Sequence, residues 1–170
     1  MKTILVVLSV FLLTAVSKAQ IKKIHGFVQH IEGGAMQDNN AESRNNDKVK
    51  AGNERYFVFI EIKKHSPVNF QQVWIKGNLY NFKTDTIRKF PLIVESSNGG
   101  ELILRDTLIR STKEEVIQLK DLTRSFGARP PLHIKKITAA NSIVIVYKHK
   151  GKGSTASSKN LDKLHPLFTQ

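Results

Sequence analysis

The sequence predicts a mainly β fold, an antiparallel β-sandwich that is Ig-like in the broad sense, with at most one short helix. Two observations predict it. About seven segments show either the alternation of apolar and polar residues that is typical of strands or a continuous β-branched run. Turn-forming residues such as Asn-Gly and Pro separate these segments. A small closed β-barrel is the competing architecture, because the same pattern serves both folds.

Length and composition bound the organisation of the chain. Its 170 residues favour one domain, since chains of about 100–200 residues usually fold around one core. We assign residues 1–19 to a signal peptide, 20–147 to a single β domain, and 148–170 to a C-terminal linker and tail. The chain has no cysteine, which excludes disulfide scaffolds, thiolate metal sites and cysteine nucleophiles.

The first nineteen residues have the layout of a secretory signal peptide. Lys2 precedes an apolar run from Ile4 to Val16, and the small residues Ser17 and Ala19 stand three and one positions before the expected cleavage site. The run is too short for a helix that crosses about 30 Å of hydrocarbon, which needs roughly 20 residues. We therefore expect cleavage after Ala19, export to the periplasm or beyond, and no transmembrane segment in the mature chain. A retained short anchor is the alternative.

The first part of the domain predicts strands around a polar loop. Residues 21–31 mix apolar and polar side chains and predict the first strand. Residues 33–53 are rich in Asn, Asp and Gly, which predicts a long, exposed and disordered loop. Residues 56–62 are apolar on both faces, as in a central strand that is covered on both sides. Residues 73–82 follow as a strand in which Gly77 marks a bulge or bend.

A hairpin is expected in the middle of the chain. Residues 87–94 predict a strand that lies at a sheet edge or is kinked at Pro91, because proline lacks the backbone N–H that a central strand donates. The Asn-Gly pair within residues 97–100 supplies the positive φ angles of a tight turn. The strand before this turn is therefore expected to pair with residues 102–109.

The segment 112–126 is compatible with two structures. Thr112 and Glu115 form a capping-box pattern, and later apolar residues share one helical face, which favours a helix. The alternative is a strand that pairs back on residues 108–110.

Two strands and a tail complete the expected order. Residues 142–147 are a continuous β-branched run and predict a buried strand, and residues 133–137 predict a weaker one. Residues 148–170 combine Lys, Gly and Ser with a short apolar end, the composition of a flexible basic linker and tail.

The sequence predicts no catalytic residue, no metal ligand and no cofactor. His30 and Glu32 are the best local pair of metal-binding side chains, but a zinc site needs a third protein ligand and none is indicated. There is no Gly-x-Ser-x-Gly elbow, and residues 151–155 lack the spacing of a phosphate-binding loop. Glu61 and Glu95 remain as scattered carboxylates that a glycan hydrolase could pair across a cleft.

The positive charge of the chain is the remaining indication of a partner. It has 27 Lys and Arg against 14 Asp and Glu, a formal net charge of +13. Clustered lysines attract phosphate-rich or acidic partners, although lysines also solvate a surface and protect sheet edges. Nucleic acid is disfavoured as a partner, because an exported protein is separated from nucleic acid and because the aromatic residues lie in apolar strands. The candidate binding residues are Lys22, Lys23, Lys63, Lys64, Lys135, Lys136, Lys148, Lys150 and Lys152.

These observations lead to three hypotheses about function. The first is an exported, bacterial-type β-sandwich that acts as a non-enzymatic binding module in the cell envelope, with an envelope protein or an anionic glycan as its partner. The second is a small periplasmic hydrolase that acts on glycan through paired carboxylates. The third is an accessory subunit of an envelope assembly. The absence of cysteines and of Asn-x-Ser/Thr sequons is typical of a bacterial rather than a glycosylated secreted protein.

Overall fold

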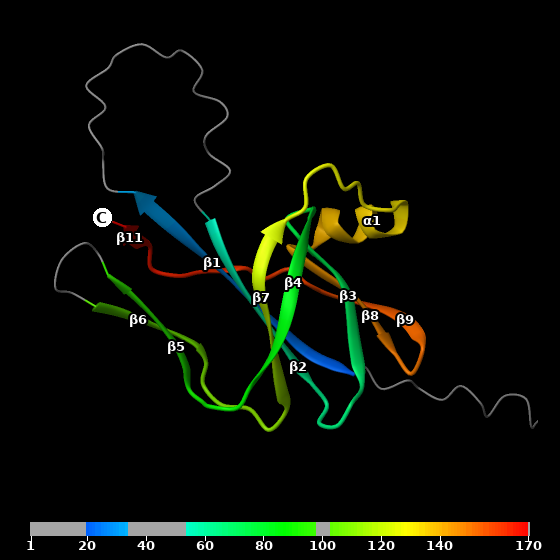
Figure 1. The fold of residues 1–170 in the computed structure, drawn as a ribbon, viewed down its shortest axis with the longest axis horizontal. Helices are drawn as coiled ribbons and strands as arrows, with labels where there is room; N and C mark the ends of the chain where they lie inside the picture. The colour runs from blue at the N-terminus through cyan, green and yellow to red at the C-terminus, as the bar shows by residue number, and fades with distance from the viewer. Residues whose placement is uncertain (1–19, 34–53, 98–102, 170) are drawn as a thin grey trace, which may run out of the picture.

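The structure is a computed structural model that describes residues 20–33, 54–97 and 103–169 (Figure 1). The strands are β1 (Ile21–Gly33), β2 (Glu54–Ile62), β3 (Val68–Ile75), β4 (Asn78–Ile87), β5 (Leu92–Ser97), β6 (Ile103–Ile109), β7 (Glu115–Arg124), β8 (Ile143–His149), β9 (Lys152–Ser158), β10 (Asp162–Lys163) and β11 (Leu167–Thr169). The helix within these ranges is α1 (Leu132–Ala140).

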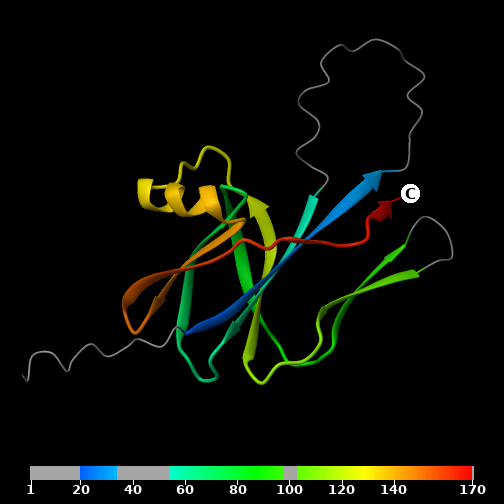
Figure 2. The ribbon, with the colours of Figure 1, turned by 180° about the vertical axis from the view of Figure 1, so that it is seen from behind.

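Most of the strands belong to one curled sheet. Its order is β10-β1-β2-β7-β4-β3-β8-β9, and β11 also pairs with β1. Neighbours from β1 to β9 are antiparallel, whereas β10 and β11 run parallel to β1. The sheet curls into a half-barrel, and the two-stranded sheet β5-β6 forms a separate arm (Figures 1 and 2). The predicted mainly β fold is confirmed, in a form that combines features of a sandwich and a barrel.

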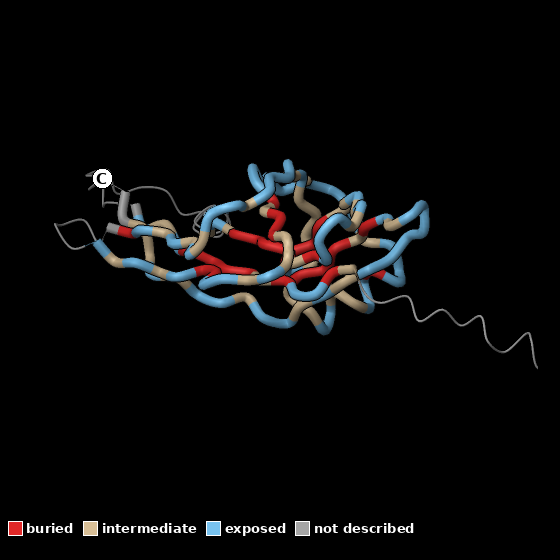
Figure 3. The backbone as a smooth tube through the Cα atoms, turned by 90° about the horizontal axis from the view of Figure 1, so that it is seen from below, coloured by how far each residue is buried: buried red, intermediate tan, exposed pale blue. Residues whose placement is uncertain are grey.

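The inward side chains of the half-barrel form the main hydrophobic core. Val58 and Ile60 of β2, Ile75 of β3, and Ile143 and Ile145 of β8 are all fully buried there. Alternate residues of a strand point to opposite faces, so each of these strands contributes every second side chain. Figure 3 shows the buried residues along the middle of the molecule, between exposed turns.

The outer face of β1 and β2 carries a second core beneath β5 and β6. Phe27, Phe57 and Phe59 pack there against Leu108 and Ile109 at the end of β6. The rings of Phe27 and Phe59 meet edge to face, with centroids 6.3 Å apart. The prediction that residues 56–62 form a central strand with two covered faces is confirmed.

Two-residue turns connect β3 to β4 and β8 to β9. Lys76 and Gly77 have φ angles of 48° and 76°, and Lys150 and Gly151 have φ angles of 48° and 77°. Two consecutive positive φ angles are typical of type I′ turns, whose twist matches that of the flanking strands. Residues 73–82 are therefore two strands, and the prediction of one strand with a bend at Gly77 is wrong.

The segment 112–126 is a strand and not the favoured helix. As β7 it lies between β2 and β4, so both of its faces are partly covered. Val116 points to the outer core and Leu119 to the inner core, and a strand with apolar residues on both faces imitates helical spacing. The alternative pairing with residues 108–110 is also wrong. Phe126, which the helix would have buried, is 85% exposed.

The helix occurs instead where a weak strand was predicted, at residues 133–137. Only Ile134 of α1 is buried, against Trp74 and Val144 on the outer face of β3 and β8, and Ile137 packs beside it. A one-turn spacing of two apolar residues is too short a signal to separate helix from strand. The side chain of Asn141 donates to the Ile137 carbonyl oxygen at 2.9 Å and closes the helix.

The chain changes sheets at Pro91. The strand predicted for residues 87–94 is interrupted: β4 ends at Ile87, and β5 begins at Leu92 after a cis Phe90–Pro91 bond. The predicted pairing across the next turn is confirmed, because β5 and β6 are antiparallel. The Asn-Gly turn itself, like the signal peptide at 1–19 and residues 34–53 of the polar loop, lies outside the described residues.

The prediction of a flexible linker and tail at 148–170 is wrong for most of that segment. Residues 152–158 form β9 against β8, and the chain then returns along β1 as β10 and β11. Small polar residues such as Ser and Gly are common in linkers, but β9 is a strand at the edge of the sheet and needs few apolar side chains.

A buried polar network attaches the C-terminal segment to the rest of the fold. The Gln29 side-chain amide donates to Ser96 Oγ at 2.7 Å and to the His165 carbonyl oxygen at 3.1 Å. The His165 ring and its backbone N–H both contact the Asp106 carboxylate, at 2.8 and 2.9 Å. These contacts join β1, both strands of the second sheet and the segment before β11.

The curl of the sheet requires a glycine in β1. A Cβ at Gly26 would overlap Ile143 Cδ1 of β8 and would lie 3.2 Å from the carbonyl oxygen of Asn160. β1 and β8 are not neighbours in the sheet, so this contact crosses the interior of the half-barrel. The missing side chain lets the two walls approach closely.

We predict that Gly26→Ala lowers the free energy of unfolding by about 1–3 kcal/mol, the usual cost of overpacking a core. Urea denaturation measures it. The added Ile143→Val change removes the overlapping methyl group, so the double variant should lose at least about 1 kcal/mol less than the sum of the single variants.

Gly153→Ala is the matched control, because a Cβ at Gly153 of β9 would have no neighbour within 4 Å. It should leave stability unchanged or raise it by less than about 1 kcal/mol. Equal effects at the two glycines would contradict the close approach at Gly26.

Candidate functional site

Seven of the nine predicted lysines lie at one end of the half-barrel. β1 begins where β2 ends, since Ile21 pairs with Ile62 and the Lys63 N–H donates to the Gln20 carbonyl oxygen at 3.0 Å. β3 begins where β8 ends, since Val68 pairs with His149. Three segments far apart in the sequence therefore bring their lysines together. We call this set the basic end: Lys22, Lys23, Lys63, Lys64, Lys148, Lys150 and Lys152.

Local backbone geometry exposes these side chains. A register shift between Ile21 and Lys23 lets both Lys22 and Lys23 face solvent while Ile21 and Ile24 stay buried. The tight turn after His149 likewise presents its lysines to solvent. All seven side chains of the basic end are exposed. No ion pair formed within the described ranges involves any of them.

Four further cations at this end were not predicted from the sequence. Arg88 and Lys89 follow β4, and Arg110 and Lys113 lie between β6 and β7; all four are exposed. They reach the basic end because β4 ends, and β7 begins, beside the last residue of β2. Only the strand order reveals this, so no local sequence signal could have found them.

The remaining two predicted lysines, Lys135 and Lys136, lie elsewhere. They are exposed on α1, which packs on Trp74 and Val144 near the opposite end of β3 and β8. The structure therefore does not bring them together with the other seven.

A cleft opens at the basic end between β3 and β4. These strands pair only next to their turn, over residues 73–75 and 78–80. Beyond that point β3 continues along β8 while β4 continues along β7, so the two strands diverge. The space between them is a cleft of about 800 Å³.

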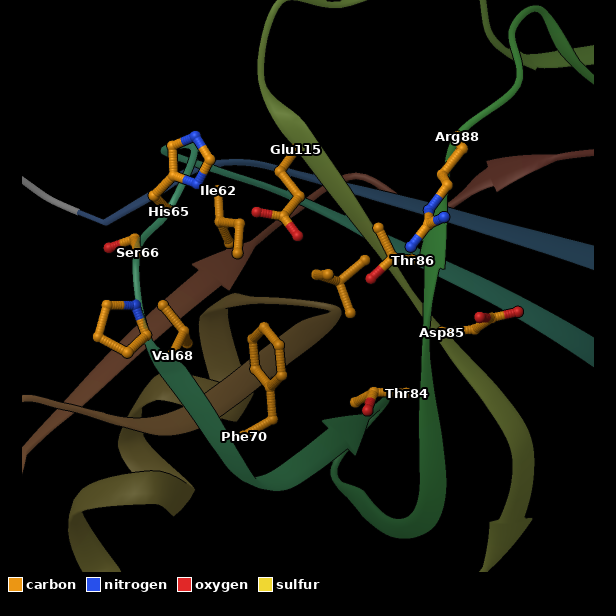
Figure 4. Close-up of a pocket in the computed structure, with 12 residues that line it drawn as sticks. Ile62, His65, Ser66, Val68, Phe70, Thr84, Asp85, Thr86, Arg88 and Glu115 are labelled. Carbon is orange, nitrogen blue, oxygen red and sulfur yellow. The ribbon is translucent and has the colours of Figure 1, made fainter.

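Apolar and charged side chains line this cleft. Figure 4 shows Phe70 of β3 and Glu115 of β7 pointing into it, with Thr86 of β4 on the opposite wall. Asp85 points away from the cleft and binds the Lys120 ammonium at 2.7 Å, which lowers the pKa of the Asp85 carboxyl. Glu115 is therefore the carboxylate that faces the interior of the cleft among the residues that line it.

The carboxylates considered for hydrolysis do not meet. Glu61 accepts hydrogen bonds from the Thr112 hydroxyl at 3.0 Å and lies 2.6 Å from His25 Nε2, half-buried on the main sheet. Glu95 pairs with Arg105 at 2.9 Å on the second sheet. Each acid has its own partner, and neither lines the cleft between β3 and β4. Among the described residues, no group of three His, Asp or Glu side chains could hold a metal ion.

Polar and aromatic contacts join β2 to the β3–β4 turn at the opposite end of the half-barrel. Lys76, in the turn between β3 and β4, binds the Glu54 carboxylate of β2 at 2.9 Å. The Tyr56 hydroxyl also donates to Glu54, and the Tyr56 and Tyr80 rings meet edge to face at 5.7 Å. The hydrogen bond from Tyr56, followed by that from Lys76, lowers the pKa of Glu54; burial chiefly raises the pKa of Tyr56.

Comparisons of the chain with models of protein families, with curated proteins and with solved structures found no match. In the part of the chain that the structure describes, no helix has the length and apolar character needed to cross a membrane.

We predict that Tyr56→Phe raises the pKa of Glu54 toward its ordinary value of 4.5, because the phenol is the largest cause of the lowering. A carboxyl group whose pKa is lower in the folded protein than in the unfolded protein stabilises the fold at pH values above its unfolded pKa. This stabilisation is lost as the pH falls through the folded pKa. The variant should therefore lose less stability than the parent protein below about pH 4.5.

An NMR titration of the Glu54 side-chain carbon measures this pKa directly. Tyr147→Phe is the control, since Tyr147 is a buried tyrosine of β8 that does not contact Glu54. An unchanged Glu54 pKa in the Tyr56 variant would contradict the assigned cause.

Proposed function

We propose that this protein is an exported, non-enzymatic binding module of the bacterial cell envelope that binds an anionic partner through its basic end. The observation that carries the proposal is the convergence of Lys22, Lys63, Lys148 and their neighbours at one end of the half-barrel, the end at which the cleft opens. The pattern of the first nineteen residues supports export, and an envelope offers acidic proteins and anionic glycans as partners.

Clustering is what distinguishes the basic end from an ordinary solvated surface. A lysine paired with a nearby acid has little attraction left for a partner, as with Lys76 and Glu54 at the opposite end. The lysines of the basic end make no such pairs within the described residues. Their potentials add, which raises both the affinity and the association rate for an anion at low salt.

We predict that the purified protein binds an isolated envelope fraction at low salt and is released as salt rises, because exposed charges are screened beyond about 8 Å at physiological ionic strength. Co-sedimentation at increasing sodium chloride concentration measures the binding. No retention at the lowest salt concentration would reject an anionic partner.

A charge-matched pair of variants locates the surface. Lys63→Glu with Lys64→Glu places two acids at the basic end and should weaken binding at least tenfold, a loss of about 1.4 kcal/mol. Lys135→Glu with Lys136→Glu makes the same change of net charge on α1 and should weaken binding less than twofold. Equal losses in both variants would show that net charge alone, and not the basic end, is responsible.

A further inference from the structure

The cleft at the basic end continues as a fissure between two strand edges. β3 lacks a partner strand along residues 68–72 on the side of β4, and β4 lacks one along residues 81–87 on the side of β3. Smaller hollows extend the cleft along the same two strands, between Phe70 of β3 and Phe82 of β4. We call this continuous space the β3/β4 fissure.

The edges and the floor of the fissure suit different parts of an extended peptide. The backbone N–H and C=O groups on the edge of each strand need hydrogen-bond partners. The floor is apolar, since Val68, Phe70 and Phe82 pack against the main core and remain half-buried. An inserted strand would pair with an edge through its backbone and place every second side chain on this floor.

We propose that the β3/β4 fissure binds an extended acidic peptide of a partner protein as an added strand. This inference rests on the proposed function and names the class of partner. A glycan chain lacks the regular N–H and C=O groups that two strand edges match, so the edges favour a peptide.

Charge fixes which part of the peptide is acidic. Arg88 lines the cleft at the mouth of the fissure, and Lys148 and Lys150 line the adjoining hollow at the start of β3. Inside the mouth Glu115 faces the cleft and repels a carboxylate. The peptide therefore carries apolar residues at alternate positions within the fissure and acidic residues where it emerges.

A second divergence of strands is a poorer candidate. β2 and β7 stop pairing beyond Val58 and Leu119, toward the start of β2, and the hollow between them has a volume of about 600 Å³. Its walls carry Arg55 and Lys120 together with Glu54 and Asp121, so it has no excess of either charge. This balance gives no basis for choosing a ligand, whereas the β3/β4 fissure opens onto the basic end.

Selection from a displayed library of random 12-residue peptides on the intact protein provides the probe. We expect the enriched peptides to alternate apolar residues and to end in an acidic run. On binding, backbone amides within residues 68–72 and 81–87 should become protected from hydrogen exchange, while those of β9 at 152–158 should not change.

A pair of tryptophan variants tests the location with the same enriched peptides. Thr84 is exposed on the wall of the fissure, so Thr84→Trp should obstruct it and weaken binding at least tenfold in fluorescence anisotropy. Thr155 is an exposed strand threonine of β9, and Thr155→Trp should weaken binding less than twofold. If Thr84→Trp fails to fold, the exchange protection of the unaltered protein decides.

Different results of these experiments would overturn different parts of the proposal. Acidic peptides without alternation that bind the Thr84 variant as well as the parent would overturn strand addition and leave the proposed anion binding in place. Protection confined to β9, with loss of binding in the Thr155 variant, would overturn the fissure as the site. Enriched peptides without acidic residues would overturn both the inference and the proposed function.

Discussion

The close approach of β1 to β8 at Gly26 is the constraint on which the remaining architecture depends. A Cβ at this position would overlap Ile143 Cδ1 and crowd the Asn160 carbonyl oxygen, so the groups that face Gly26 would have to shift. Because the walls meet there, the inward residues of β1, β2, β3 and β8 share a single core, and the ends of these strands lie together. The clustering of lysines is thus a consequence of how the sheet curls, since none of the three segments that supply them is a neighbour of another in sequence.

The two ends of the half-barrel differ in chemistry for a structural reason. At one end the short turn between β3 and β4 reaches back to β2, and Lys76, Glu54 and the tyrosine pair cover the core. At the other end the connections between strands carry lysine and arginine but few acids, and the divergence of β3 from β4 leaves the core accessible. An apolar floor that lies beside a cluster of cations favours ligands that combine both characters.

Sequence patterns predicted strands correctly where a run of residues was apolar throughout. They failed where the spacing of apolar residues fitted both a strand and a helix. The central strand at residues 56–62 and the β-branched run at 142–147 were identified because burial on both faces requires apolar residues throughout. β7 was predicted to be a helix because apolar residues such as Val116 and Leu119, which lie on opposite faces of the strand, imitate helical spacing. That both faces of this strand are covered depends on the tertiary structure. All nine candidate lysines are exposed, but their division into seven and two depends on strand order, which local patterns do not encode. The fissure was invisible for the same reason, since it is an absence of pairing between two otherwise ordinary strands.

The hydrogen bond from Gln29 to the backbone of His165 joins residues 136 positions apart, and it has a consequence for how the molecule assembles. Contacts between distant parts of a chain form late, because closing a long loop costs entropy before any packing compensates for it. β1 is among the first segments to be synthesised, yet its outer edge remains unpaired until β10 and β11 arrive. During that interval the nascent chain presents an open strand to its surroundings, so the order of synthesis, and not the final stability alone, determines when this protein is protected from wrong pairing.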